Sequence, residues 1–220
     1  MYGVFRIPWS INMLGEERYQ RFLAAARGEE DFVPALVEFD EALSTALQRD
    51  LRRVELMLRN AYDRTMRLLW KNETHWLIDP QSYAHCTLRR RYPKLAAAAE
   101  AGKADAATLV SNVTFGFWMQ LTTTSAEQPL FVPYLKHSFN AGTGRAAVHS
   151  VVERLVRLRN RVAHHEPVID LSLRSFVDDM VWLSEAMLPP RAMDLRANGE
   201  TRKLLEEVWV PMQRRRWVTL

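Results

Sequence analysis

Residues 154–167 of this 220-residue chain contain most of the side chains that could take part in catalysis or ligand binding. Their order is Arg-Leu-Val-Arg-Leu-Arg-Asn-Arg-Val-Ala-His-His-Glu-Pro. Arginine carries a planar, permanently charged group that suits phosphate, so nucleic acid is a candidate partner. Histidine can gain or lose a proton near neutral pH. The stretch therefore predicts a functional site in which arginines and histidines act together.

Arg159 breaks the pattern of its own helix. With about 100° of rotation per residue, the valines and leucines of residues 148–162 form one apolar arc, and Arg159 falls inside it, about 20° from Val148. A guanidinium there is costly unless it is paired or faces a ligand, and such conflicts are expected at functional sites. The structural alternative is a buried Arg159 paired with an internal carboxylate, with His164 and His165 capping helix carbonyls.

Asn160 and His164 are four residues apart, so they share a helix face and the amide can orient the imidazole. Arg159 and His164 lie about 140° apart on an ideal helix, so spacing alone does not bring them together. Three features could: distortion of the helix end before Pro167, the reach of the arginine, or a second copy of the helix across a twofold axis.

Arg154, Arg157 and Arg161 fall on the side opposite the apolar arc, where arginines ordinarily form a solvated face. We assign them as candidate RNA-binding residues. On an earlier helix, Glu55 and Arg59 are spaced i,i+4 and are candidate supporting residues. Glu55 either turns inward and fixes Arg159 or forms a surface ion pair with Arg59.

The sequence gives little support for a zinc site, a cysteine nucleophile or a glycine-rich phosphate-binding loop. Consecutive histidines point about 100° apart on a helix, and no second ligand pair exists, which disfavours a zinc site at His164, His165 and Glu166. Cys86 beside His85 is a weak nucleophile candidate, and the glycines of residues 140–145 lack a phosphate-binding signature. We expect neither a metal nor a cofactor, and we expect the arginines of residues 214–216 to form a solvated tail.

Composition places the chain among soluble globular proteins, with 48% hydrophobic and 25% charged residues. No apolar run is long enough to span a membrane, and the first residues do not resemble a signal peptide. With a single cysteine, these features predict a cytoplasmic protein. Arginine supplies 25 of the 30 basic residues, which favours a nucleic-acid partner but is equally expected from a GC-rich genome.

Helical periodicity dominates, so we predict a single all-α domain over residues 1–220. Apolar residues at steps of three and four indicate one long amphipathic helix ending near Trp70. The chain beyond the Pro189-Pro190 pair is expected to form a C-terminal helical extension, residues 191–220. The predicted helices cover about residues 16–27, 35–70, 82–91, 93–101, 105–121, 129–139, 145–163 and 171–187.

The block Leu-Arg-Asn-Arg-Val-Ala-His-His-Glu-Pro-Val, residues 158–168, resembles the Abi-like proteins, abortive-infection proteins of the AbiD/AbiF type within the HEPN superfamily. Their signature is Arg, usually a polar residue, then His after four to six intervening positions, which Arg159, Asn160 and His164 satisfy. The resemblance extends over about residues 16–190. Phe39-Asp40 departs from it, because relatives usually carry an aromatic-Trp-Asn sequence there.

The resemblance implies a HEPN-like helical bundle that dimerises through the motif helices and acts as a metal-independent endoribonuclease in phage defence or as a toxin. His164 would be the general acid/base, with His165 as its rival, Arg159 would stabilise charge on the phosphate, and Asn160 would orient the histidine or the phosphate. Implied partners are RNA, a second copy of the chain, and an antitoxin that is either a small RNA or a protein. The alternative is a non-catalytic HEPN module that binds RNA or a protein with the same helix.

Overall fold

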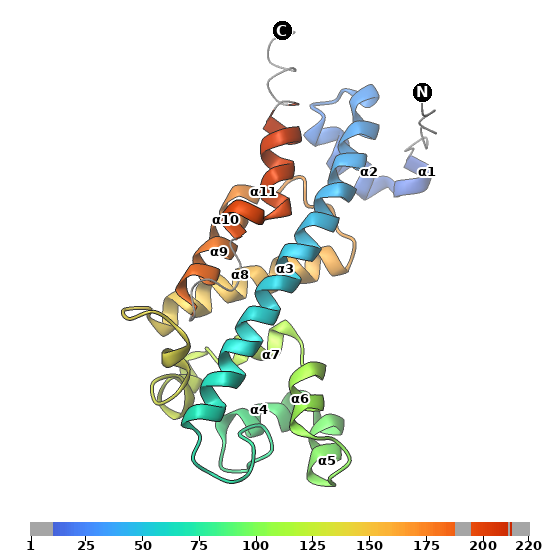
Figure 1. Ribbon diagram of the computed structural model, residues 1–220. Helices are drawn as coiled ribbons and strands as arrows, with labels where there is room; N and C mark the ends of the chain where they lie inside the picture. Colours follow the sequence, from blue (N-terminus) through green and yellow to red (C-terminus); the bar gives the residue numbers. More distant parts are fainter. Residues whose placement is uncertain (1–10, 188–194, 211, 213–220) are drawn as a thin grey trace. The chain divides into compact units, whose positions relative to one another are not determined.

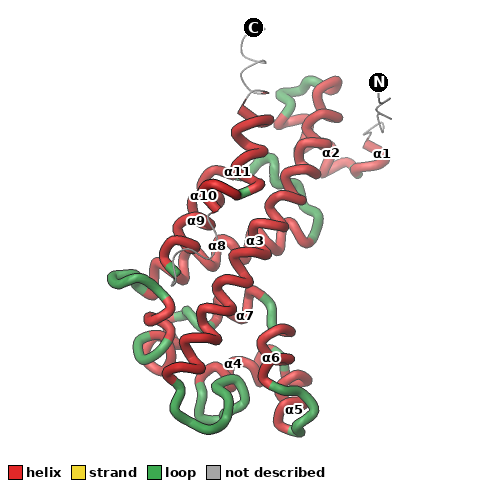
Figure 2. Tube along the Cα trace, viewed as in Figure 1, coloured by secondary structure: helices red, strands yellow, loops and turns green. Residues whose placement is uncertain are grey.

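The computed structural model describes residues 11–187, 195–210 and 212, and these ranges consist of helices joined by loops and turns, with no named strand (Figure 2). The predicted all-α class is confirmed. The α-helices are α1 (Ile11–Leu14), α2 (Glu16–Ala25), α3 (Val33–Leu69), α4 (Tyr83–Arg91), α5 (Pro93–Glu100), α6 (Ala106–Asn112), α7 (Phe115–Gln120), α8 (Arg145–Ala163), α9 (Leu173–Ala186), α10 (Leu195–Asn198) and α11 (Glu200–Leu204) (Figure 1).

The long helix is α3, whose 37 residues correspond to about 55 Å of rise. Its apolar stripe was predicted from steps of three and four residues, and all but the last of those positions are buried. Burial of this stripe along most of the helix stabilises α3 far more than helix propensity does. The buried positions are Leu43, Leu47, Leu51, Val54, Leu58, Ala61 and Met66.

Contacts within the chain form two compact units. The first unit comprises residues 1–50, 158–177 and 199–220, and the second comprises residues 51–157 and 178–198. Helices α3 and α8 each contribute residues to both units. The assignment of one domain over residues 1–220 stays a prediction.

The first unit includes part of the predicted C-terminal extension, as α11 and the π-helical turn Leu205–Trp209. The Trp209 ring stacks on Phe39 of α3, with 5.1 Å between ring centroids. The Asp50 carboxylate accepts a hydrogen bond of 2.9 Å from the Thr201 N–H in the first turn of α11. The extension is therefore packed against α3 by an aromatic contact and by a buried carboxylate that satisfies a helix N-terminus.

Aromatic side chains form the core of the second unit. Tyr62, Trp76, Phe117 and Trp118 are almost completely buried, and Tyr62 contacts the ring of Trp118 edge-on. Phe115 and Phe131 are buried as well, so these aromatic side chains pack the core and are not available to stack bases.

Two predicted helices differ from the structure. The helix expected at residues 105–121 is broken into α6 and α7. Val113 is extended, and the Tyr92 hydroxyl accepts a hydrogen bond from the Thr114 N–H at the break. The helix expected at residues 129–139 is a π-helical turn (Glu127–Phe131) followed by a 3-10 turn (Leu135–Ser138), because Pro129 has no N–H to continue an α-helical ladder.

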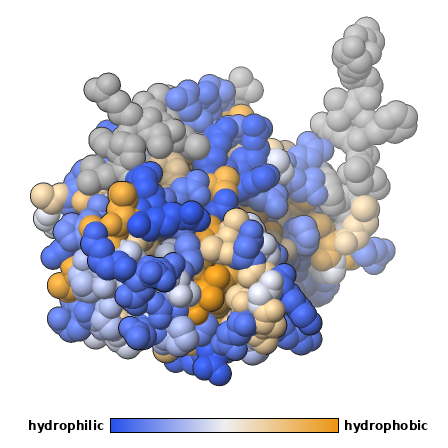
Figure 3. Space-filling model, turned by 60° about the horizontal axis from the view of Figure 1, so that its bottom comes forward, coloured by the Kyte–Doolittle hydropathy of each residue, from blue (hydrophilic) through white to orange (hydrophobic). Residues whose placement is uncertain are grey.

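One face of the molecule carries mostly hydrophilic side chains, with hydrophobic ones in smaller patches between them (Figure 3). Within the described ranges, none of the helices combines the length and the apolar character that crossing a bilayer requires. Most large hydrophobic side chains are buried, and the most exposed in the described ranges are Leu68 and Met13, at 68% and 56%.

Candidate functional site

The predicted motif occupies the end of α8 and the turn that follows it, all from Leu158 onward within the first unit. The helix ends in a Schellman motif, in which the His165 N–H bonds to the Val162 carbonyl at 3.1 Å and the Glu166 N–H bonds to the Arg161 carbonyl at 3.0 Å. The helix therefore ends before Pro167 in a regular cap, and distortion of the helix end stays one of the three alternatives for bringing Arg159 and His164 together.

His165 occupies the left-handed position of this cap, with φ of 56°. Glycine is the usual residue there, because a Cβ in this conformation is crowded by its own backbone, at a cost of about 1–2 kcal/mol. Both His164 and His165 are exposed. The turn therefore presents two adjacent imidazoles to solvent and keeps one of them on strained backbone.

The chain after the turn is held from two sides. Arg161 donates from Nε to the Pro167 carbonyl at 2.7 Å and from Nη2 to Asp170 at 2.6 Å. The buried Asp40 carboxylate accepts the N–H groups of Val168 and Ile169 through one oxygen, Oδ1, at 2.8 Å each. These contacts fix the backbone on which the histidines stand.

Arg159 is half-buried, and its Nη1 donates to the side-chain oxygen of Asn160 at 3.2 Å. Among the described residues, no carboxylate lies within ion-pair distance of Arg159. The structural alternative, a buried Arg159 paired with an internal acid, is therefore not found in the described part of the chain. The same part shows no hydrogen bond from the Arg159 or Asn160 side chains to His164.

Two pockets of the first unit border the histidine turn. The larger, the Asp40 pocket, has a volume of about 560 Å³ and is lined by Arg18, His165, the last turn of α8 and five residues of α3 between Asp40 and Gln48. The smaller, the His164 pocket, has a volume of about 380 Å³ and lies between residues 14–21 and residues 164–167. Arg18 and His165 line both pockets, whereas Arg159 and Asn160 line neither.

Arg18 and Asp40 are site residues that the sequence analysis missed. The Nε of Arg18 is buried and has no hydrogen-bond partner within the described ranges. Burial raises the pKa of Asp40 above its ordinary value, although the Val168 and Ile169 N–H groups and the charge of Arg18 act in the opposite direction. Asp40 stands within the apolar stripe of α3, so the test that singled out Arg159 would have found it.

The three candidate RNA-binding arginines all have carboxylate partners. Arg154 binds Asp179 through two nitrogens, at 2.7 and 2.6 Å. Arg157 pairs with Glu153 at 2.8 Å, and Arg161 pairs with Asp170 as described above. RNA binding by these arginines stays a prediction, and a phosphate would have to compete with those carboxylates.

The supporting residues Glu55 and Arg59 belong to the second unit. Both are half-buried, and the Nε of Arg59 is buried without a hydrogen-bond acceptor in the described ranges. The expected role of Glu55 toward Arg159 stays a prediction.

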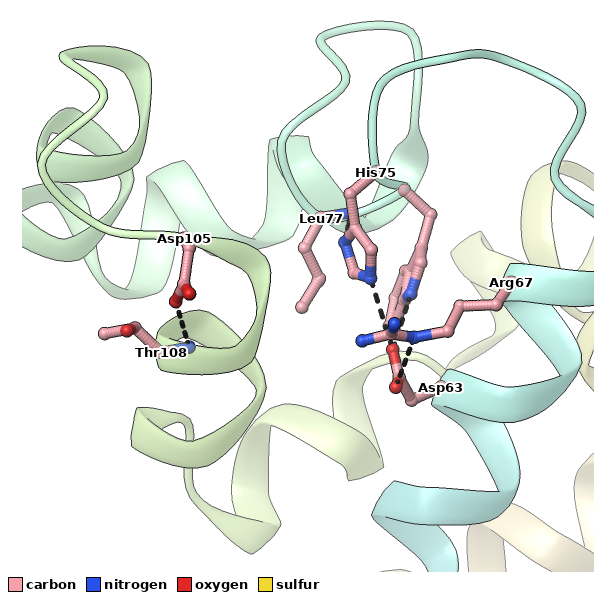
Figure 4. A network of polar contacts seen from close by, with 7 residues as sticks. Asp63, Arg67, His75, Leu77, Asp105 and Thr108 are labelled. Carbon is pink, nitrogen blue, oxygen red and sulfur yellow. Dashed lines mark hydrogen bonds and ion pairs between the residues drawn. The ribbon is translucent and has the colours of Figure 1, made fainter.

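A second polar cluster lies in the second unit, around Asp63 of α3 (Figure 4). The carboxylate accepts hydrogen bonds from His75 Nε2 at 3.3 Å, Trp76 Nε1 at 3.1 Å and Arg67 Nε at 2.8 Å. Burial raises the pKa of Asp63, but these hydrogen bonds outweigh it and hold the pKa below its ordinary value. The Nδ1 of His75 accepts the Leu77 N–H, so both ring nitrogens are engaged and the cluster fixes the loop after α3.

No group of three or more His, Cys, Asp or Glu side chains that could hold a metal ion occurs among the residues the structure describes. Cys86 is exposed, whereas His85 is buried, with Nδ1 at 3.0 Å from the Leu77 carbonyl and Nε2 at 3.4 Å from Glu100. The arginines of residues 214–216 lie outside the described residues.

Comparison with known proteins does not identify the chain: no family model, no curated protein and no solved structure matches it.

Proposed function

We propose that this protein is a metal-independent endoribonuclease of the abortive-infection or toxin type, acting in antiphage defence. In this proposal His164 is the general acid/base, Arg159 stabilises the charge that builds on the scissile phosphate, and Asn160 positions the guanidinium or the substrate. The protein works in the cytoplasm as a homodimer joined through its motif helices, and an antitoxin, RNA or protein, restrains it.

The observation that carries the proposal is the difference between Arg159 and its neighbours. Arg154, Arg157 and Arg161 are each neutralised by a carboxylate. Arg159 donates to the neutral amide oxygen of Asn160, and no carboxylate of the described residues compensates its charge. A half-buried guanidinium without a counter-ion attracts an anion strongly, since water screens it less than an exposed one.

The reaction that fits these groups is attack of a ribose 2′-hydroxyl on the adjacent phosphorus. The new O–P bond forms as the bond to the 5′-oxygen breaks, leaving a 2′,3′-cyclic phosphate on one product and a 5′-hydroxyl on the other. An imidazole either takes the proton of the 2′-hydroxyl or gives one to the leaving oxygen. One imidazole cannot readily serve both positions, so we assign the second proton transfer to His165 or to a histidine of the second copy.

The test is cleavage of total RNA by the purified protein in EDTA, with His164→Ala and His165→Ala compared at equal concentration. The proposal predicts cleavage by the unaltered protein and a loss of 10²-fold or more in His164→Ala. A larger loss in His165→Ala would transfer the acid/base role to that residue. RNA binding without cleavage would establish the non-catalytic module instead, and light scattering decides whether the protein is a dimer.

A further inference from the structure

The Asp40 pocket lies beside the histidine turn, and the proposed reaction leaves it without a role. Its volume of about 560 Å³ falls in the range of small-molecule sites, about 300–1,000 Å³. All of its lining residues belong to the first unit. His165 and Arg18 also line the His164 pocket, so a ligand that enters the Asp40 pocket lies next to the proposed catalytic turn.

Two carboxylates, from Asp40 and Glu41, and one guanidinium, from Arg18, are the permanently charged groups that line this pocket. The other polar side chains of the lining are those of Ser44, Thr45, Gln48 and His165, and the Thr45 hydroxyl donates to the Glu41 carbonyl. Two carboxylates against one permanent cation repel a phosphate group. The lining therefore selects an uncharged group that donates several hydrogen bonds.

Asp40 contributes a buried carboxylate, held in place by backbone hydrogen bonds, to the lining of the pocket. Its side chain is only 2% exposed, and both backbone N–H groups that it accepts go to Oδ1. The other oxygen, Oδ2, has no hydrogen-bond donor among the described residues, and it is not one of their fully buried atoms that lack a partner. Oδ2 is therefore open to the pocket, where a ligand N–H can replace water as its donor.

Guanine is the nucleobase that presents adjacent N–H donors, N1–H and the 2-amino group, on one edge, and a carboxylate accepts such a pair through both oxygens. Adenine and cytosine place an acceptor beside their amino group, and uracil places its single N–H between two acceptors. We propose that the Asp40 pocket binds a guanine base of the RNA, with Asp40 and Glu41 accepting its N–H groups, and thereby sets which phosphate reaches the histidine turn. The inference rests on the proposed nuclease function for its purpose, but not for its binding test.

The binding test uses full-length His164→Ala protein, titrated calorimetrically with guanosine 5′-monophosphate, inosine 5′-monophosphate and inorganic phosphate. Inosine keeps N1–H but lacks the 2-amino group, so we expect it to bind at least fivefold more weakly than the guanosine nucleotide. Inorganic phosphate alone should show no comparable affinity. Equal binding of the two nucleotides, or of phosphate alone, would overturn the proposal.

Glu41→Gln should bring the two nucleotide affinities within twofold of each other, because it replaces one acceptor oxygen with a donor. The matched control is Glu38→Gln, the same change on the same helix at an exposed residue outside the pocket, which should preserve the difference. Asp40→Asn is the second variant, used after its thermal unfolding shows that it folds. If neither pocket variant narrows the difference, the assignment of these carboxylates is wrong.

Cleavage mapping separates this inference from the proposed function. Sequencing the ends produced from a randomised RNA should show guanine enriched at one fixed position beside the cut, and Glu41→Gln should reduce that enrichment relative to the Glu38→Gln control. Cleavage without base preference would refute the assignment of the pocket to guanine but not the nuclease function. Guanosine nucleotide binding by a protein that does not cleave RNA would refute the nuclease function but not the pocket assignment.

Discussion

The turn at His164 and the cluster at His75 both combine imidazole with arginine, yet they treat the histidine in opposite ways. His75 is engaged at both ring nitrogens, by the Asp63 carboxylate and the Leu77 N–H. His164 and His165 are exposed, and the nearby Arg159 donates to an amide rather than to an acid. A histidine with both nitrogens satisfied anchors a loop, whereas an exposed one is available to move protons.

The same contrast holds for the arginines. Arg67 donates a hydrogen bond to the Asp63 carboxylate, whereas Arg159 has no acidic partner in the described part of the chain. We infer that the Asp63 cluster contributes stability and the motif turn contributes activity. Four experiments test that division.

The largest effect is expected from Arg159→Ala. Loss of the guanidinium should reduce RNA cleavage by 10²-fold or more, because transition-state charge on the phosphate loses its stabilising partner. Arg157→Ala removes an exposed arginine that pairs with Glu153 on the same helix, and should lower the rate far less than Arg159→Ala does, because a phosphate has to compete with Glu153 for this guanidinium. Equal losses in both variants would mean that Arg159 has no special role.

Asp63→Ala is expected to lower stability and to leave RNA cleavage unchanged, the opposite of Arg159→Ala. This substitution leaves the buried indole N–H of Trp76 and the ring N–H of His75 without their acceptor, and should lower the free energy of unfolding by about 1–3 kcal/mol. Urea unfolding measures the change. Cleavage per folded molecule should be unaffected, and a loss of activity at full folding would place the cluster in the catalytic machinery.

Acidity should weaken the Asp63 cluster selectively. The folded state holds the pKa of Asp63 below the ordinary 3.8, so the ionised carboxylate contributes stability that is complete above that value and is lost as pH falls through the folded pKa. The stability difference between the unaltered protein and Asp63→Asn should therefore be constant near neutral pH and shrink in acid below 3.8. A difference that grows in acid would reverse the sign assigned here.

The smallest effect concerns the strain at His165. His165→Gly should raise the free energy of unfolding by about 0.5–1 kcal/mol relative to His165→Ala, because only glycine adopts the left-handed cap position without a Cβ penalty. Both variants lack the imidazole and should therefore cleave RNA equally. Thermal unfolding of the pair isolates the backbone contribution, and a more stable alanine variant would refute the strain.

Periodicity predicted the helices well where one apolar stripe runs without interruption, as in α3 and α8. It failed at Val113 and Thr114, where a tertiary hydrogen bond from Thr114 to the Tyr92 hydroxyl coincides with the break. It also extended the first helix to residue 27, whereas α2 ends at Ala25 and Arg27 takes positive φ, as His165 does after α8. The cap geometry depends on backbone hydrogen bonds, which side-chain patterns do not encode.

The candidate site residues stay predictions, but the signal that singles out Arg159 can be compared with the structure. The conflict of Arg159 with its apolar arc is visible in one helix, and the absence of an acidic partner among the described residues agrees with the functional interpretation. Asp40 and Arg18 were missed because their importance arises from distant segments: Asp40 bonds to residues 128 and 129 positions away. A charged residue inside an apolar stripe is the signal that Asp40 shares with Arg159.

The stacking of Trp209 on Phe39 bears on where the folding unit ends. The predicted resemblance to abortive-infection proteins extends only to about residue 190. A protein shortened to that point would expose the Phe39 ring, now 4% exposed, and remove the Thr201 N–H that bonds to Asp50. Phe39 immediately precedes the carboxylate that holds the chain behind the histidines. The segment after residue 195 thus supports the part of α3 that holds the chain behind the histidine turn, and a protein trimmed to the predicted resemblance would lose that support.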